Sequence, residues 1–251
     1  MRLTRTRNQN LNRDFTFYNK SSRKMNELKD KSVHLMITSP PYPMIKKWDD
    51  LFGKVDFNFQ HDQLLPVWQE CHRVLVDGGI ACVNIGDATR SIDGEFQCYP
   101  NYAKITMAFL EIGFIPLIPI LWKKISNRPN AFLGSGFYPP NAYVAQDHEY
   151  IGIFRKGSLR KFTPKDPIRI ESMYTKQERD LWFQQVWNIP GAKGAKESSS
   201  FPKEIAYRLI RMFSVIGDTV LDPFCGSGTV LHEAVTYRRN GVGYDIEDSI
   251  K

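Results

Sequence analysis

The sequence predicts an α/β fold in which a mostly parallel sheet is covered by helices on both faces. Short apolar runs rich in β-branched residues alternate with amphipathic stretches of helical period along most of the 251 residues. Glycine- and proline-containing turns separate these runs, and no internal repeat stands out. A sheet built from alternating strands and helices binds its ligands at the carboxyl ends of its strands, so the chemistry is expected there.

Seven strands are expected, each from a short, largely apolar run that stops at a polar or turn-forming residue. The runs occupy residues 15–19, 33–38, 80–85, 115–122, 150–154, 219–222 and 241–246. Pro116 and Pro119 fall within the fourth run, and proline cannot donate a hydrogen bond to a neighbouring strand. That run is therefore expected to be an edge strand or to be kinked.

Helices are expected where apolar residues recur three or four positions apart. They span residues 23–28, 63–76, 102–112, 176–186, 202–213 and 229–237. Gly113 can end the third helix and the Gly78–Gly79 pair the second, because glycine tolerates the left-handed conformation of a helix cap. Residues 126–146 are rich in Gly, Pro, Asn and aromatic residues and are expected to form a long loop.

The composition is that of an ordinary globular chain, with 42% hydrophobic and 24% charged residues. The net charge of +7 favours a polyanionic partner. No apolar run is long enough to span a membrane, and the first residues do not resemble a secretory signal. The cysteines, Cys71, Cys82, Cys98 and Cys225, form no C-x-x-C pair. Neither a metal site nor a disulfide framework is indicated, and a cytoplasmic location is expected.

Two basic segments lie outside the predicted sheet. Residues 1–13 contain no acid and carry Arg2, Arg5, Arg7 and Arg13. They are interpreted either as an arm that contacts phosphates or as a solvated terminus. Residues 155–197 are basic, proline-containing and without a clean period apart from one helix, and are interpreted as an insert that recognises a target.

A glycine turn follows the strand at 219–222 and opens a helix. Gly226 and Gly228 allow the backbone to turn tightly and to approach a ligand without a Cβ in the way. Asp245 ends the following strand, and a carboxylate there can accept hydrogen bonds from both ribose hydroxyls of an adenosine ligand. The turn differs from the dinucleotide fingerprint G-x-G-x-x-G, and the chain has no phosphate-binding G-K-[ST] loop.

A Ser-Pro-Pro-Tyr tetrapeptide, Ser39 to Tyr42, follows the strand at 33–38. Its serine hydroxyl and proline carbonyl are two hydrogen-bond acceptors, which suits them to an amine with two hydrogens, such as the exocyclic amine of a nucleic-acid base. Such an amine is a poor nucleophile because its lone pair is delocalised into the ring. Two acceptors aimed at its hydrogens stabilise the positive charge that grows on nitrogen during methyl transfer. The Ser39 hydroxyl and the Pro40 carbonyl can be these two acceptors. Pro41 stiffens this backbone, and Tyr42 offers a ring to stack on a base swung out of its helix.

The two motifs together resemble those of the amino-methyltransferases that modify cytosine N4 or adenine N6 in DNA. The resemblance implies S-adenosyl-L-methionine as the cofactor. The residues that it assigns to cofactor binding are Asp222, Pro223, Phe224, Cys225, Gly226, Ser227, Gly228, Thr229 and Asp245. In that family, Phe224 would lie close to the cofactor, the turn would hold its methionine end and Asp245 its ribose. Serine at the first tetrapeptide position goes with cytosine N4, whereas aspartate or asparagine goes with adenine N6.

The tetrapeptide precedes the glycine turn, as in the β branch of this family. The branch is circularly permuted relative to the usual Rossmann-like S-adenosylmethionine-dependent methyltransferase fold with its mostly parallel seven-stranded sheet. The resemblance therefore implies that residues 15–19 pair beside the last strand. It divides the chain into a basic arm (1–13), a catalytic half (14–154), a target-recognition insert (155–197) and a cofactor-binding half (198–251).

The chain departs from the family pattern at two places. Family members often carry Gly-Asp where this chain has Asn19-Lys20, and Asn19 is assigned as a substitute hydrogen-bond partner near the adenine. Many members have a histidine shortly before a Phe-Pro pair, where this chain has serines. Contacts to the methionine end are nevertheless assigned to Ser200 and Phe201.

Three alternatives to cytosine N4 methylation of DNA stay open. The same tetrapeptide would serve an RNA cytidine methyltransferase or an adenine N6 methyltransferase, and a chain that kept only the fold would bind nucleic acid without catalysis. DNA is the favoured partner, RNA is possible, a membrane is not expected, and the oligomeric state is unknown. Glu149 is interpreted as either a structural or a catalytic hydrogen-bonding residue, and Trp122, Trp182 and Trp187 are expected in the core.

Overall fold

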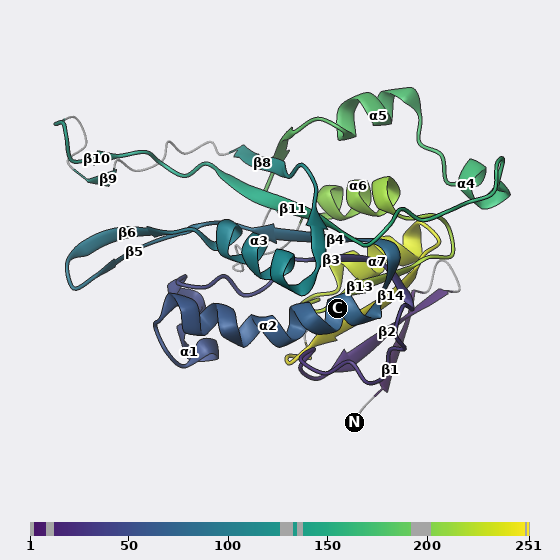
Figure 1. Cartoon of the computed structure of the whole chain (residues 1–251), viewed down its shortest axis with the longest axis horizontal. Coiled ribbons are helices and arrows are strands. Elements are labelled where there is room, and N and C mark those ends of the chain that lie inside the picture. The colour runs from purple at the N-terminus through teal and green to yellow at the C-terminus, as the bar shows by residue number, and fades with distance from the viewer. Residues whose placement is uncertain are drawn as a thin grey trace.

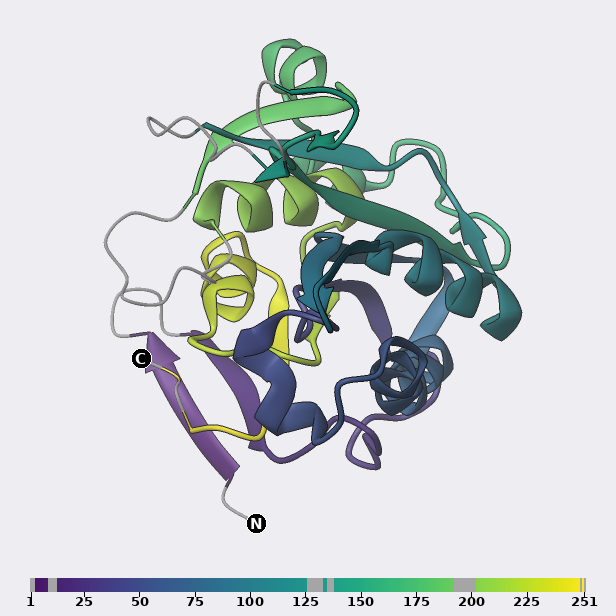
Figure 2. The same ribbon diagram turned by 90° about the vertical axis from the view of Figure 1, so that its left-hand side faces the viewer.

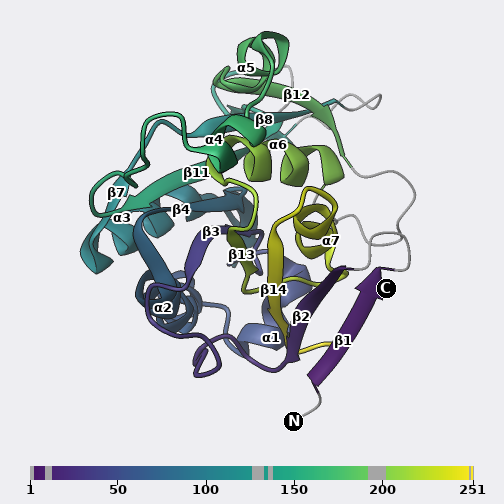
Figure 3. The ribbon, with the colours of Figure 1, turned by 90° about the vertical axis from the view of Figure 1, so that its right-hand side faces the viewer.

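The structure is a computed structural model that describes residues 3–8, 13–125, 133–134, 138–191, 202–248 and 250. Its main feature is a twisted sheet with helices on both faces (Figure 1). Helices α2 (Phe57–Val74) and α3 (Asn101–Ile112) cover one face, and α6 (Lys203–Phe213) and α7 (Thr229–Thr236) cover the other (Figure 3). The α/β class expected from the alternating pattern is confirmed.

Within the described residues the main sheet has ten strands, in the order β1-β2-β14-β13-β3-β4-β11-β8-β12, with β7 beside β11. The strands are β1 (Leu3–Asn8), β2 (Arg13–Asn19), β3 (Val33–Thr38), β4 (Leu75–Ile85), β7 (Phe114–Pro116), β8 (Ile120–Ile125), β11 (His148–Lys156), β12 (Val186–Pro190), β13 (Thr219–Asp222) and β14 (Asn240–Asp245). Among the described strands, the antiparallel pairs are those that β1 makes with β2 and that β11 makes with β4, β7 and β8. All other pairs are parallel, so the sheet is mostly parallel, as expected.

All seven expected strands are present. The sheet has more strands than expected because one run is divided in two and a strand is added at each edge. The run at 115–122 is divided into β7 and β8, with Pro119 in the gap between them. Strand β1 adds to one edge of the sheet and β12 to the other (Figure 2). Strand β2 pairs in parallel with β14, with Tyr18 opposite Tyr244. The N-terminal part of the chain therefore completes the sheet beside the last strand, as the permuted order requires.

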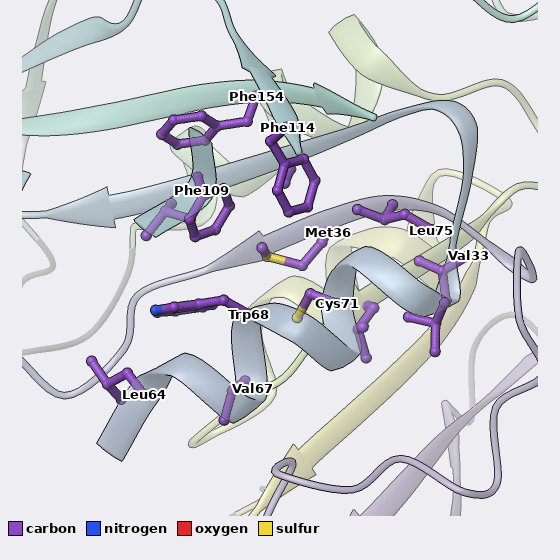
Figure 4. Packing of buried hydrophobic residues seen from close by; sticks show 14 of the residues in the cluster. Val33, Met36, Leu64, Val67, Trp68, Cys71, Leu75, Phe109, Phe114 and Phe154 are labelled. Atoms are coloured by element: carbon purple, nitrogen blue, oxygen red, sulfur yellow. The ribbon is translucent and has the colours of Figure 1, made fainter. Parts of the chain in front are cut away.

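Two apolar clusters hold the layers together. Beneath α2 and α3, Met36 of β3 packs with Trp68, Cys71, Phe109 and Phe154 (Figure 4). On the other face, Leu35 and Ile37 pack with α6 and α7. Strands covered on both faces have near-continuous apolar sequences, which is why the run at 33–38 carries no clear alternation. The three tryptophans expected in the core are buried there, with Trp122, Trp182 and Trp187 at most 4% exposed.

Two hairpins leave the sheet at one side (Figure 1, left). Strands β5 (Ala88–Ile92) and β6 (Glu95–Tyr99) form one, and the short β9 (Leu133–Gly134) and β10 (Ala142–Tyr143) pair in the other. Phe96 and Tyr143 stack with ring centroids 4.4 Å apart, so the hairpins touch. The first hairpin was not expected from the sequence, and the second lies in the predicted loop.

The structure corrects two local expectations. Residues 23–28 form turns and not a helix. The Arg73 side chain of α2 donates to the Met25 and Leu28 carbonyls and so anchors these turns against α2. Helix α2 ends at Val74 and not at the glycine pair, since Leu75 already begins β4 and is fully buried. Gly78 has φ +79° inside that strand.

The segment at 155–197 is partly built into the main domain. Helices α4 (Pro167–Glu171) and α5 (Lys176–Trp182) lie outside the sheet, but β12 is one of its strands and Trp187 is 1% exposed. The short helices η1 (Lys46–Trp48) and α1 (Asp49–Phe52) precede α2. None of the described helices is both long and apolar enough to cross a membrane.

Candidate active site

The predicted motifs meet at one edge of the sheet. Strands β2, β14, β13 and β3 are parallel neighbours, and they end at Asn19, Asp245, Asp222 and Thr38. Parallel strands have their carboxyl ends on the same side, so the tetrapeptide after β3 and the glycine turn after β13 emerge next to each other. This juxtaposition was the central spatial expectation from the sequence.

A buried hydrogen bond joins the two motifs. The Thr38 hydroxyl donates to Oδ1 of Asp222 over 2.7 Å, and the Phe224 amide donates to the same oxygen over 3.1 Å. Asp222 is 4% exposed, and burial raises the pKa of its carboxyl to about 7. Asp222 therefore fixes the start of the glycine turn against the start of the tetrapeptide.

The glycine turn has the backbone form that its sequence indicates. Gly226 and Gly228 have φ of +47° and +83°, a region that other residues rarely adopt. A Cβ on Gly226 would meet no atom within 4 Å, so the surface above this turn is open to a ligand. Gly228 is the N-cap of α7, and no side chain caps that helix. Its first amides suit a carboxylate group.

Asp245 faces the glycine turn from the end of β14. One carboxylate oxygen accepts from the Gly226 amide over 2.8 Å, and the other from the Glu247 amide over 3.0 Å. A carboxylate oxygen has two lone pairs, so each can accept one more hydrogen bond. Asn19 donates to the carbonyls of Asp245 and Ile246, both over 3.2 Å, and so holds the chain that carries this carboxylate.

The other assigned residues around the turn fall into two groups. Pro223 and Cys225 are buried, and burial raises the pKa of the Cys225 thiol, which excludes a thiolate role. Phe224 is half-buried and packs edge-on against Trp68, while Ser227 is exposed and Thr229 begins α7. The assigned Ser200 and Phe201 lie outside the described residues.

These groups fit S-adenosyl-L-methionine. The open glycine turn and the uncapped start of α7 suit its methionine end, and Asp245 suits its ribose hydroxyls. The Asp245 carboxylate faces the turn, where it would stabilise a sulfonium cation. Among the described residues no cluster of His, Cys, Asp and Glu could hold a metal ion.

The tetrapeptide is held by a network that reaches two other strands. The Ser39 hydroxyl lies 3.2 Å from the Tyr42 hydroxyl, which donates to Oε2 of Glu149 over 2.8 Å. The Asn84 amide nitrogen lies 2.7 Å from the Tyr42 hydroxyl, 2.8 Å from the same Glu149 oxygen and 3.4 Å from the Ser39 hydroxyl. Burial and then the charge of Glu149 raise the pKa of Tyr42 well above its usual value, so its hydroxyl keeps its proton.

The segment around the tetrapeptide is fixed by further buried contacts. Pro40 and Pro41 are buried, and Asn101, at the start of α3, donates to the carbonyls of Pro43 and Gly86 over 3.0 Å. The Met44 amide donates to Gln60 over 2.6 Å. Since both ends of the segment are anchored, the backbone that carries the Pro40 carbonyl is ordered before any substrate arrives.

Three participants in this site were not identified from the sequence: Thr38, Asn84 and Lys124, which forms an ion pair with Glu149. Asn84 is the one polar residue in the apolar run at 80–85, which is the signal that could have identified it. The hydrogen-bond partner of Glu149 could not be predicted, because Tyr42 lies 107 residues away in the sequence. Strand β4 pairs both with β3, which Tyr42 follows, and with β11, which carries Glu149, and so brings the two residues together.

A mostly parallel α/β sheet with a glycine turn, an acid-ended next strand and a Ser-Pro-Pro-Tyr tetrapeptide at one edge defines the class of S-adenosylmethionine-dependent methyltransferases. The family model described as DNA methylase, for N6 and N4 methyltransferases, matches residues 33–251. The chain therefore belongs to this family of DNA methyltransferases, and its cofactor is S-adenosyl-L-methionine.

Relatives and solved structures agree with this membership. The chain is 54% identical over 261 aligned positions to the type II methyltransferase M.MjaI of Methanocaldococcus jannaschii, covering 92% of this chain and 86% of that protein. It is 43% identical to M.MthZI of Methanothermobacter thermautotrophicus, covering 93% and 73%. A DNA modification methylase of Thermus thermophilus, TTHA0409, solved with S-adenosyl-L-methionine, is 33% identical with a TM-score of 0.76, covering 92% and 88%. The cytosine-N4-specific PvuII DNA methyltransferase, at 18% identity and a TM-score of 0.67, shares the fold.

Proposed function

We propose that this chain transfers a methyl group from S-adenosyl-L-methionine to the exocyclic N4 amine of cytosine in DNA. The observation that carries the proposal is the position of Ser39, next to Thr38, whose hydroxyl binds Asp222 at the start of the glycine turn. A serine hydroxyl at the first tetrapeptide position is thus held beside the cofactor residues. The names of the type II relatives support a modification role paired with a restriction nuclease.

The tetrapeptide would bind the amine through two acceptors. Ser39 Oγ and the Pro40 carbonyl accept its two hydrogens and stabilise the positive charge that grows on nitrogen. The cofactor supplies an activated methyl group. The flipped base would lie against the Tyr42 side, where the ring is half-buried against the core and its hydroxyl is held by Asn84 and Glu149.

The remaining site roles follow from the glycine turn. Asp245 would accept hydrogen bonds from the ribose hydroxyls with the lone pairs that the Gly226 and Glu247 amides leave. Residues 222–229 would hold the methionine end together with Ser200 and Phe201. Asn19, assigned to the adenine side, supports the Asp245 backbone in the structure, and we propose that its action on the cofactor is indirect.

DNA would approach from the carboxyl edge, where the base must enter. The basic arm, whose residues 3–8 form strand β1 at the edge of the sheet, remains a candidate for phosphate contacts, and residues 155–197 for target recognition. Within that segment, Arg160 binds Asp218 and Ser172 binds the Ile216 amide, both before β13 begins. Its first part therefore lies at the amino ends of the strands, and we expect recognition to fall to the later part and to the two hairpins.

One experiment tests this function and its alternatives. DNA and RNA of the same sequences are incubated in parallel with labelled S-adenosyl-L-methionine, digested to nucleosides and separated. We expect the label in N4-methyldeoxycytidine from DNA. Label in N6-methyladenine or in RNA cytidine would replace the proposal by the corresponding alternative. Absence of label, together with no thermal stabilisation by the cofactor, would favour a non-catalytic binding module.

A further inference from the structure

Ser39, Tyr42 and Glu149 form a chain of hydrogen bonds whose direction is fixed by chemistry. A carboxylate can only accept, so the single Tyr42 proton points to Glu149 over 2.8 Å. The Asn84 amide fills one Tyr42 lone pair over 2.7 Å. The Ser39 proton fills the other over 3.2 Å. The Ser39 hydroxyl proton is thereby turned away from the substrate side. The Asn84 amide nitrogen lies 3.4 Å from the Ser39 oxygen and can occupy one of its lone pairs, and the other remains for an incoming hydrogen.

The orientation of Asn84 supports this direction. Its side-chain nitrogen must face Glu149, because an amide oxygen 2.8 Å from a carboxylate oxygen would repel it. Its side-chain oxygen is buried and, within the described part of the chain, has no hydrogen-bond partner. An unpaired buried acceptor is unfavourable, so the hydrogen bonds of the Asn84 nitrogen hold the amide in this orientation although its oxygen is left unpaired.

Glu149 lies at the end of this chain of hydrogen bonds. Its side chain is 13% exposed, Oε2 accepts from Tyr42 and Asn84, and Oε1 pairs with Lys124 of β8. Two strands and the tetrapeptide segment thus converge on one carboxylate. The neighbouring Asp147 also pairs with a β8 lysine, Lys123, over 3.2 Å, but its side chain is 46% exposed and its ion pairs are with Lys123 and His148, outside the tetrapeptide.

We propose that Glu149, acting through Tyr42, orients Ser39 as an obligatory hydrogen-bond acceptor for the target amine and takes up the proton that the amine loses. This rests on the proposed function. The nitrogen–methyl bond forms as the methyl–sulfur bond breaks, the electron pair stays on sulfur, and the nitrogen then holds one proton in excess. Ser39 Oγ accepts that proton and gives its own to Tyr42 Oη, which gives its own to Glu149 Oε2. Glu149 ends as a neutral acid, and its proton returns to solvent after product leaves.

Glu149 and Tyr42 are positioning residues in this proposal, so the test compares Glu149→Gln and Tyr42→Phe with the matched control Asp147→Asn. A glutamine keeps the shape and an accepting oxygen but cannot take up a proton. Single-turnover methylation is measured on a DNA duplex that wild type methylates in the labelling experiment proposed above. We expect a loss of about 100-fold for E149Q and Y42F, no further loss in the double variant, and less than about 2-fold for D147N.

A binding measurement without turnover tests the orientation of Ser39. With S-adenosylhomocysteine bound, wild type should bind a duplex with cytosine at the target more tightly than one with uracil, whose carbonyl offers no hydrogen to an acceptor. In Y42F the Ser39 hydroxyl loses its Tyr42 partner and can rotate, so this preference should fall, whereas E149Q keeps an acceptor for the Tyr42 proton and should retain the preference. An unchanged preference in Y42F, or E149Q turning over within about 3-fold of wild type, would overturn the proposal. Failure of wild type to methylate any base amine would instead overturn the proposed function.

Discussion

The Thr38 hydroxyl donates a 2.7 Å hydrogen bond to Asp222, 184 residues later in the chain. This contact joins the end of β3 to the end of β13, and hence the tetrapeptide to the glycine turn. Both side chains are at most 4% exposed. The bond therefore forms only in the folded protein, and it couples the position of the proposed methyl acceptor to that of the cofactor.

Replacing Asp222 by asparagine should change how stability depends on pH. Burial raises the pKa of Asp222 from 3.8 to about 7, so between these values the folded state retains a proton that the unfolded state releases. The free energy of unfolding of wild type should therefore fall as the pH rises from about 4 to about 7 and then level off.

D222N keeps an accepting oxygen and lacks this titration. Relative to wild type, it should gain on the order of 2 to 3 kcal/mol between about pH 5 and about pH 8. Denaturant unfolding at both pH values measures the difference. Equal pH dependence in the two proteins would show that the buried carboxyl does not titrate in this range.

Removing the Ser39 hydroxyl should slow methyl transfer with little loss of cofactor binding. The hydrogen-bond partners of this hydroxyl, Tyr42 and Asn84, lie outside the glycine turn. We expect S39A to turn over about 100-fold more slowly, because one acceptor for the developing charge is lost. Calorimetry should find its cofactor dissociation constant within about 2-fold of wild type. Equal turnover would exclude the hydroxyl from catalysis.

Removing the Asp245 carboxylate should weaken cofactor binding. D245A loses the proposed ribose contacts and also the acceptor for the Gly226 amide. Hydrogen bonds to a charged group contribute about 1.5–3 kcal/mol, so the dissociation constant should rise about 10- to 100-fold. D245N keeps one accepting oxygen and should bind more tightly than D245A. A dissociation constant unchanged in D245A would remove this residue from the site.

Removing Arg160 should lower stability and leave methyl transfer intact. Arg160 makes two hydrogen bonds to Asp218, which is 4% exposed, at the amino end of β13. The loss of Arg160 would leave a buried charge without its main partner, at a cost on the order of 3 kcal/mol. Lys31 is the control, since both side chains of its ion pair with Asp77 are more than half exposed, and K31A should unfold at nearly the same denaturant concentration as wild type. Slower transfer in R160A at saturating substrates would place this cluster closer to the chemistry than the sheet topology does.

Much of the fold could be predicted because the strands buried on both faces are apolar along their length. The run at 33–38 and the glycine turn after 222 are local features, and each fixes its own conformation. Even the pairing of β2 with β14 followed from motif order, since the tetrapeptide precedes the glycine turn as it does in the permuted branch of the family.

The contacts that tune the site could not be predicted, because each joins residues far apart in the sequence. Glu149 binds Tyr42 only because β11 turns back antiparallel beside β4, and an acid before an apolar run carries no sign of that partner. The helix expected at 23–28 failed for a related reason. Arg73, from α2, donates to the Met25 and Leu28 carbonyls and anchors this segment as turns, and the local pattern carries no sign of a partner 45 or more residues away.

The structure of the protein bound to S-adenosyl-L-methionine tests most directly whether donor and acceptor groups share one site. We expect the ribose on the Asp245 carboxylate, the methionine carboxylate at the start of α7, and the methyl group facing Ser39 Oγ and the Pro40 carbonyl. A cofactor bound elsewhere, or one whose methyl group points away from Ser39, would contradict the account.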